Sequence, residues 1–248
     1  MDSDSGTSRR GFVRLCASAL ALVGAIPSLL ARTGNTLHRY PRARLVDADN
    51  HPVIADRLRV GENYLFHYPY VSTPCFLIDV GVPVETGATL HTENGEAYRW
   101  PGGVGPNRSI VAFSAICAHR MSHPAPEVSF INYRHKTVAF RNGAEERTER
   151  SQVIYCCSEK SVYDPLQGAR VLGGPARQPL AAILLEQDAT DGTLSAAGTC
   201  GGEMFERFFN EFGFRLSLEY RTQDIRALVS ESTTVLPLAE FCQNQILC

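Results

Sequence analysis

The chain has 248 residues, of which 44% are hydrophobic and 20% charged, and its formal net charge at pH 7 is -2. This length and composition are typical of a globular protein with one sizeable core plus extensions, or of two small domains. The 24 basic residues form no stripe, which gives no support to nucleic-acid binding. The 20 glycines and 14 prolines follow no period, which excludes collagen-like and low-complexity classes.

The first 32 residues have the pattern of an export signal. Two adjacent arginines, Arg9 and Arg10, precede a mostly apolar run over residues 12–30 that carries a single charge. A charged start followed by an apolar segment is typical of a secretory signal or a membrane anchor. The paired arginines indicate the twin-arginine route, which exports proteins that are already folded. We therefore expect residues 1–32 to take the chain to the periplasm, as a cleaved signal or as an uncleaved anchor in the cytoplasmic membrane.

Cysteine usage fits an exported protein with some unpaired thiols. Cys16 lies in the N-terminal segment, so seven of the eight cysteines remain for the folded part. Because seven is odd, these cysteines cannot all pair with one another. Four of them are candidates for disulfides formed after export, with a connectivity that the spacing does not give: Cys75, Cys200, Cys242 and Cys248.

From residue 33 to residue 198 the chain alternates short apolar runs with turn residues. The pattern predicts strands at 44–46, 75–80, 110–116, 153–155, 169–172 and 181–185, a hairpin within 128–140, a Gly/Pro loop at 100–108 and a charged loop at 141–150. Many short strands at close spacing are typical of an all-β sandwich or barrel. We therefore predict an all-β fold, built as a small antiparallel β-sandwich or barrel.

The pattern changes over residues 199–248. Four phenylalanines recur at i, i+3, i+4 and i+7, namely Phe205, Phe208, Phe209 and Phe212. This spacing predicts a short helix with one aromatic face, which Gly213 can end. That face either caps the core or docks a partner subunit. We expect residues 199–248 to form a partly helical C-terminal extension.

Two segments carry residues with metal-ligand chemistry. The first is Cys117-Ala-His119, and the second is CCSEKSVYD at residues 156–164. Each follows a hydrophobic strand and opens a loop, so the two loops can lie together at one end of a small β-structure and enclose an iron–sulfur cluster. In such a cluster, thiolates hold one iron and imidazoles on the other raise the reduction potential. Cys-x-His alone is a weak signal, because most such pairs are structural.

The segment 101–119, PGGVGPNRSIVAFSAICAH, resembles the first cluster-binding box and preceding loop of Rieske proteins, above all the small subunit of arsenite oxidase. The second segment resembles the second Rieske box, Cys-x-x-His-Gly-Ser-x-Tyr/Phe-Asp. Residues 172–180, LGGPARQPL, resemble the proline loop that covers the cluster. The resemblance spans roughly residues 55–198 and keeps the order of the family.

This resemblance implies a Rieske-like domain over residues 33–198. Its cluster-binding loops would be 117–123 and 156–164, and its proline loop 173–180, with Pro175 against the cluster. A [2Fe–2S] cluster is the implied cofactor.

The implied ligands are Cys117, His119 and Cys156, and the hydroxyls of Ser161 and Tyr163 would donate hydrogen bonds to the cluster and its ligands.

The fourth ligand departs from the family. When the box is aligned without gaps on its Ser-x-Tyr-Asp end, Glu159 occupies the position of the second imidazole. A register shifted by one residue makes Cys157 the thiolate and Lys160 the fourth residue. Two histidines between the boxes, His123 and His135, are further candidates, although solvated loop histidines are commoner.

A disulfide joins the two loops in many family members. Its positions are occupied here by Ser122 and Ser158, so that bridge cannot form.

The resemblance implies an electron-transfer subunit of an exported redox complex. It would pass single electrons between a larger enzyme, such as a molybdopterin oxidoreductase, and a cytochrome or quinone pool. No Gly-x-Ser-x-Gly, P-loop or dinucleotide motif is present, so catalysis would reside in the partner. Two alternatives remain: a degenerate domain without a cluster that serves as a docking subunit, and a mononuclear zinc site on Cys117, His119, Cys156 and Glu159.

Overall fold

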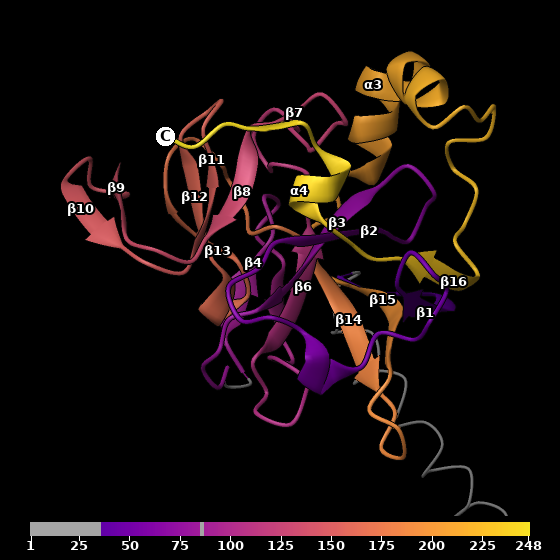
Figure 1. Ribbon diagram of the computed structural model, residues 1–248. Coiled ribbons are helices and arrows are strands. Elements are labelled where there is room, and N and C mark those ends of the chain that lie inside the picture. Colours follow the sequence, from indigo (N-terminus) through magenta and orange to yellow (C-terminus); the bar gives the residue numbers. More distant parts are fainter. Residues whose placement is uncertain (1–35, 85–86) are drawn as a thin grey trace, which may run out of the picture. The chain divides into compact units, whose positions relative to one another are not determined.

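The computed structural model describes residues 36–84 and 87–248 (Figure 1). The export segment predicted at residues 1–32 lies outside the described residues. Within the described ranges, no helix is both long and apolar enough to span a membrane.

Eight strands form the main sheet, in the order β16-β1-β15-β14-β6-β3-β2-β17. Their bounds are β1 Leu37–Val46, β2 Tyr64–His67, β3 Pro74–Asp79, β6 Ile110–Ser114, β14 Ala182–Gln187, β15 Leu194–Cys200, β16 Glu231–Thr234 and β17 Leu236–Pro237. All neighbours pair antiparallel except β16, which runs parallel to β1. Only Val235 separates β16 from β17, although these strands form opposite edges of the sheet, so the sheet nearly closes into a barrel.

A smaller sheet has the order β13-β12-β11-β8. Its bounds are β8 Ile131–Arg134, β11 Val153–Cys156, β12 Ser161–Asp164 and β13 Arg170–Gly173. Every residue of β11 and β12 is buried, as is every residue of β6 in the main sheet. Continuous burial of this kind explains why β6 and β11 are mostly apolar without alternation, whereas β12 also buries the polar side chains of Ser161 and Asp164. The prediction of an all-β fold is confirmed.

Short elements complete the described structure. The two-stranded pairs are β4 Thr89–His91 with β5 Ala97–Arg99, β7 Val128–Ser129 with β18 Asn244–Gln245, and β9 Val138–Arg141 with β10 Arg147–Arg150, and the helices are η1 Ala55–Arg57, η2 Pro165–Gln167, α3 Phe205–Glu219 and α4 Leu238–Phe241. Strands β16, β17 and β18 all come from residues 199–248. This segment therefore contributes to sheets as well as to helices.

The predicted hairpin within 128–140 and the predicted loop at 141–150 are both wrong. Strand β8 pairs with β11, whereas β9 pairs with β10 from the predicted loop. The physical reason is the turn that begins at Asn142, whose side-chain oxygen accepts hydrogen bonds from the backbone of Ala144 at 2.9 Å and Glu146 at 3.0 Å. A local turn of this type closes a hairpin even where the flanking residues are charged.

Helix α3 is longer than the aromatic pattern predicts. It continues through Gly213 to Glu219, and Leu216 in the added turn is fully buried. Tertiary packing of Leu216 therefore outweighs the weak helix propensity of glycine. Phe205, Phe208 and Phe209 are buried beside Ile116 and Met121, so the aromatic face caps the core.

Candidate metal centre

The first box lies in a tight loop directly after β6. The backbone N–H of Cys117 donates to the carbonyl of Ser122 at 2.9 Å, and the N–H of Met121 donates to the carbonyl of Cys117 at the same distance. These two bonds close the loop on itself and hold Cys117 at its base. The Cys117 side chain is fully buried in the cluster of apolar residues that fills one side of the main sheet.

The second box is the turn of the β11–β12 hairpin. Cys156 at the end of β11 is the register partner of Ser161 at the start of β12, which leaves residues 157–160 as the turn. Both Cys156 and Ser161 are fully buried. The hairpin thus directs the thiol of Cys156 into the same apolar cluster that contains Cys117.

Tyr163 links the two boxes. Its hydroxyl accepts a hydrogen bond from the backbone N–H of Ala118 at 3.0 Å and lies 3.2 Å from the sulfur of Cys117. Burial and the neighbouring Cys117 raise the pKa of Tyr163 well above its usual range, so the hydroxyl keeps its proton. Because its oxygen already accepts from Ala118, its hydrogen is free to bond the Cys117 sulfur.

The two thiols of Cys117 and Cys156 lie within hydrogen-bonding reach of one another. The hydrogen bond from Cys156, followed by that from Tyr163, lowers the pKa of Cys117. The same contact with Cys117, together with burial, raises the pKa of Cys156. This contact therefore favours negative charge on the Cys117 sulfur over the Cys156 sulfur.

His119 and Glu159 form a second pair. The His119 Nδ1 lies 3.3 Å from the Glu159 Oε2, with side-chain exposures of 28% and 24%. The His119 Nδ1 is nevertheless buried and makes no hydrogen bond in the described structure, and the Ser161 hydroxyl is in the same condition. Buried polar atoms without partners are uncommon and indicate a missing ligand or a functional role.

The four donor side chains form two pairs, not one compact set. Among the described residues, the only group of three or more His, Cys, Asp or Glu ligand atoms within 4.8 Å of one another is the exposed Asp47, Asp49 and His51. A tetrahedral zinc ion needs four ligand atoms at about 2.0 to 2.3 Å from the metal, which requires the four atoms to lie close to one another. This spacing does not suit the mononuclear site, whereas a binuclear cluster takes one pair on each metal.

The backbone supports the ungapped register of the second box. Lys160 has a φ of 58°, in the left-handed region that favours glycine. In that register Lys160 occupies the glycine position of the pattern, and Glu159 the position of the imidazole.

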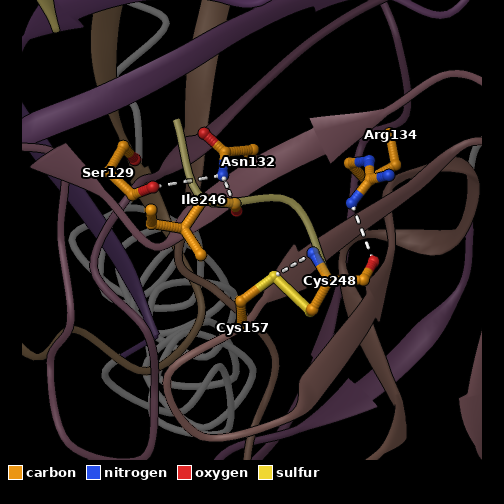
Figure 2. Close-up of a disulfide and its surroundings, with 6 residues drawn as sticks. All are labelled: Ser129, Asn132, Arg134, Cys157, Ile246 and Cys248. Atoms are coloured by element: carbon orange, nitrogen blue, oxygen red, sulfur yellow. Dashed lines mark hydrogen bonds between the residues drawn. A yellow bond between two sulfur atoms is a disulfide. The ribbon is translucent and has the colours of Figure 1, made fainter. Parts of the chain in front are cut away.

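The shifted register is wrong, because Cys157 is not a free ligand. Cys157 forms a disulfide with Cys248, as Figure 2 shows. The Cα atoms of the two residues are 5.6 Å apart. This distance is ordinary for a disulfide. The other three cysteines that were candidates for disulfides, Cys75, Cys200 and Cys242, are free and buried.

Neither loop histidine joins the donors. His123 is not a solvated residue: it is 8% exposed, and its ring packs edge-on against Phe208 and Phe212 at centroid distances of 4.7 and 5.1 Å. His135 is exposed, and its Nδ1 lies 3.2 Å from the hydroxyl of Tyr133. Glu159 is therefore the fourth donor that the structure brings to His119.

The predicted proline loop packs on the second box through its glycines. A Cβ added at Gly174 would lie 2.3 Å from the carbonyl oxygen of Lys160 and 2.6 Å from the Cα of Ser161. Only glycine permits this approach of the two backbones. Pro175 itself is exposed, and with Lys160 it lines a surface cavity of about 650 Å³.

Asp164 supports the second box in a way that its sequence position did not indicate. Its carboxylate is fully buried and lies 2.9 Å from an Arg150 nitrogen and 3.4 Å from an Arg170 nitrogen. It also accepts the backbone N–H of Leu166 at 3.1 Å. Two cations and one amide therefore fix the C-terminal end of β12, the strand that also contains Ser161 and Tyr163.

No protein-family model matches the sequence. Among solved structures, the chain is similar to the soluble domain of the Rieske protein II (soxF) from Sulfolobus acidocaldarius, with 24% sequence identity and a TM-score of 0.42. The similarity covers 64% of this chain and 78% of that chain. The functional proposal therefore depends on the geometry of the two loops.

Proposed function

We propose that this chain holds a [2Fe–2S] cluster between its two loops and passes single electrons within an exported redox complex. The observation that carries the proposal is the arrangement of donors in two pairs. Cys117 and Cys156 provide two sulfurs, and His119 and Glu159 provide one nitrogen and one oxygen. In a Rieske-type cluster, two thiolates bind one iron and two harder donors bind the other. Here a carboxylate would take the place of one of the two imidazoles.

The residues present fit such a group. Neither the buried Nδ1 of His119 nor the buried hydroxyl of Ser161 makes a hydrogen bond among the described residues. The Nδ1 is therefore available to bind a metal, and the hydroxyl to donate a hydrogen bond to the cluster. The two sulfurs are fully buried, which excludes water from them. When bound, the cluster supplies reversible one-electron transfer.

The chain's own residues tune that chemistry. The Tyr163 hydroxyl donates to the Cys117 sulfur and stabilises its negative charge, which favours the reduced state. Glu159 acts in the opposite direction, because an anionic oxygen donor stabilises the oxidised metal more than a neutral imidazole does. His119 and Glu159 are the partly exposed pair, so a redox partner would approach from their side.

The proposed complex follows from the resemblance and not from a contact in this structure. The partners would be a larger oxidoreductase of the molybdopterin type and a cytochrome or quinone pool. The location would be the periplasm, with the N-terminal segment as signal or anchor. Changing Arg9 and Arg10 to Lys should then keep the chain in the cytoplasm, and undiminished periplasmic accumulation would contradict a twin-arginine signal.

The test is the metal content of protein purified anaerobically from its native host. We expect iron and acid-labile sulfide in equal amounts and an EPR signal that appears on reduction. Cys117→Ser and Cys156→Ser should both lose the iron and the sulfide. Cys75→Ser is the matched control, because Cys75 is also free and fully buried but lies in β3, with its thiol bonded to the carbonyl of Tyr68 at 3.0 Å.

One observation favours the second candidate function, a docking subunit without a cluster. A protonated His119 and an ionised Glu159 can form an ion pair at 3.3 Å that needs no metal. Absence of both iron and sulfide from careful anaerobic preparations would reject electron transfer and favour this alternative. Docking would then be the remaining function, and co-purification of this chain with the partner complex would test it.

A further inference from the structure

Residues 243–248 lie along the segment between the two boxes and are hydrogen-bonded to it. Strand β18 pairs in parallel with β7, with Asn244 opposite Val128 and Gln245 opposite Ser129. The backbone N–H of Ile246 donates to the carbonyl of Ser129 at 2.8 Å, and that of Gln243 donates to the carbonyl of Pro126 at 2.8 Å. The 243–248 segment therefore follows the chain that leads from the first box into β8.

Side chains of β8 extend this contact. The amide of Asn132, which is 1% exposed, donates to the carbonyl of Ile246 at 3.0 Å (Figure 2). A guanidinium nitrogen of Arg134 donates to the carbonyl of Cys248 at 3.1 Å (Figure 2). These bonds place the Cys248 sulfur beside the second box, where it is bonded to Cys157.

Cys157 is the anchor of the turn that carries the second box. Of the four residues at 157–160, only Cys157 is buried; Ser158 and Lys160 are exposed and Glu159 is partly exposed. The N–H of Cys157 donates to the carbonyl of Phe130 at 2.7 Å, and its sulfur is bonded to Cys248. The fixed point of this turn is thus the residue directly after the candidate ligand Cys156.

We propose that Cys157 and Cys248 are positioning residues for the candidate centre. Through the disulfide, the 243–248 segment holds turn 157–160 so that Cys156 faces Cys117 and Glu159 faces His119. This inference rests on the proposed function, because positioning matters only if the four donor residues bind a cluster. The disulfide and the positions of the four side chains can nevertheless be measured in protein without a cluster.

The first test measures the proximity of the two thiols in cluster-free protein. Diamide, an azo oxidant, takes two electrons and two protons from a thiol pair, and mass spectrometry then detects a Cys117–Cys156 disulfide. In the double variant Cys157→Ser/Cys248→Ser we expect this disulfide to form roughly tenfold more slowly, because a loosened turn lowers the effective concentration of one thiol at the other. The matched control is Cys242→Ser, which removes a free cysteine of the same region whose thiol donates to Asn244 at 3.0 Å. Equal rates in the double variant and the control would overturn the inference.

A second measurement needs no variant. Mild treatment of the folded wild type with dithiothreitol transfers two electrons and two protons to the Cys157–Cys248 bond and leaves the dithiol as its cyclic disulfide. We expect faster amide hydrogen exchange in peptides that cover 156–161 and 243–248, with unchanged exchange in β3 and β6. Unchanged exchange in the box after complete reduction would also overturn the inference.

The reconstituted protein separates this inference from the proposed function. If wild type binds iron and sulfide, the double variant should show broadened EPR lines from a mixture of ligand geometries. If wild type binds neither, electron transfer is rejected, while the thiol-coupling and exchange measurements still decide whether Cys157 and Cys248 position the box.

Discussion

Replacing Tyr163 with Phe removes one hydroxyl that makes two contacts between the boxes. The hydroxyl accepts from the Ala118 N–H at 3.0 Å and lies 3.2 Å from the Cys117 sulfur. Tyr163 is fully buried, so water cannot take its place. The variant should therefore change both the free energy of unfolding and the electrostatics of the sulfur pair.

The two effects have different magnitudes. The buried N–H of Ala118 loses its partner, which costs about 1 to 3 kcal/mol of unfolding free energy. The Cys117 sulfur loses a donor that stabilises negative charge, so the reduction potential should fall. If about 1 kcal/mol of that stabilisation differs between the oxidation states, the fall is roughly 40 mV, since about 1.4 kcal/mol corresponds to 59 mV for one electron.

The assays are urea denaturation and redox titration, with Tyr98→Phe as the control. Tyr98 is also buried, but its hydroxyl has no hydrogen-bond partner among the described residues, so its loss should leave the reduction potential unchanged and should not lower the free energy of unfolding. In cluster-free protein the same change should raise the pKa of Cys117, seen as a shifted thiolate absorbance, because the Tyr163 bond lowers it. If the potential, the thiolate titration and the stability all match wild type, Tyr163 does not link the boxes.

Three further changes test other parts of the site. Glu159→His removes a negative charge beside His119 and should raise the potential in a redox titration; an unchanged potential would place Glu159 outside the ligand set. Loss of the Cys157–Cys248 disulfide, whose residues are 91 positions apart, should cost about 4 to 5 kcal/mol of unfolding free energy in urea, and a loss below about 1 kcal/mol would indicate that the bond does not form in solution. Burial first, and then the charge of Arg215, lower the pKa of His123 from 6.5 to about 4, so the unfolded chain binds more protons than the folded chain between these pH values. The contribution of His123 to the free energy of unfolding should be complete above pH 6.5 and fall by up to about 3 kcal/mol as the pH decreases to 4. His123→Gln should flatten this pH dependence.

The sequence predicted the elements whose pattern is local. The buried strands β6 and β11 are mostly apolar runs; two residues separate the end of β6 from the first box, and β11 ends at Cys156, the first residue of the second box. Three of the predicted phenylalanines of α3, Phe205, Phe208 and Phe209, lie buried on one face, and Phe212 is partly buried beside them. Gly213 ended the predicted helix too early because the burial of Leu216 is a tertiary effect that no local rule contains.

The disulfide was beyond the reach of the pattern. Cys157 and Cys248 are 91 positions apart, and spacing alone does not select one pairing among seven cysteines. The adjacent Cys156 and Cys157 looked interchangeable in the sequence. Their difference arises from the strand: successive residues of an extended chain point to opposite sides. Cys156 therefore faces Cys117, whereas Cys157 faces the 243–248 segment.

The shape of the turn explains why Glu159, and not Lys160, meets His119. The hairpin register pairs Cys156 with Ser161, so residues 157–160 must reverse the chain within four positions. Lys160 closes that reversal in the left-handed conformation, with a φ of 58°, and its side chain is exposed. A lysine gains nothing from this conformation, so the backbone is imposed by the hairpin and by the close approach of Gly174. The turn thus holds Lys160 in a conformation that favours glycine, and it brings the carboxylate of Glu159 to within 3.3 Å of His119.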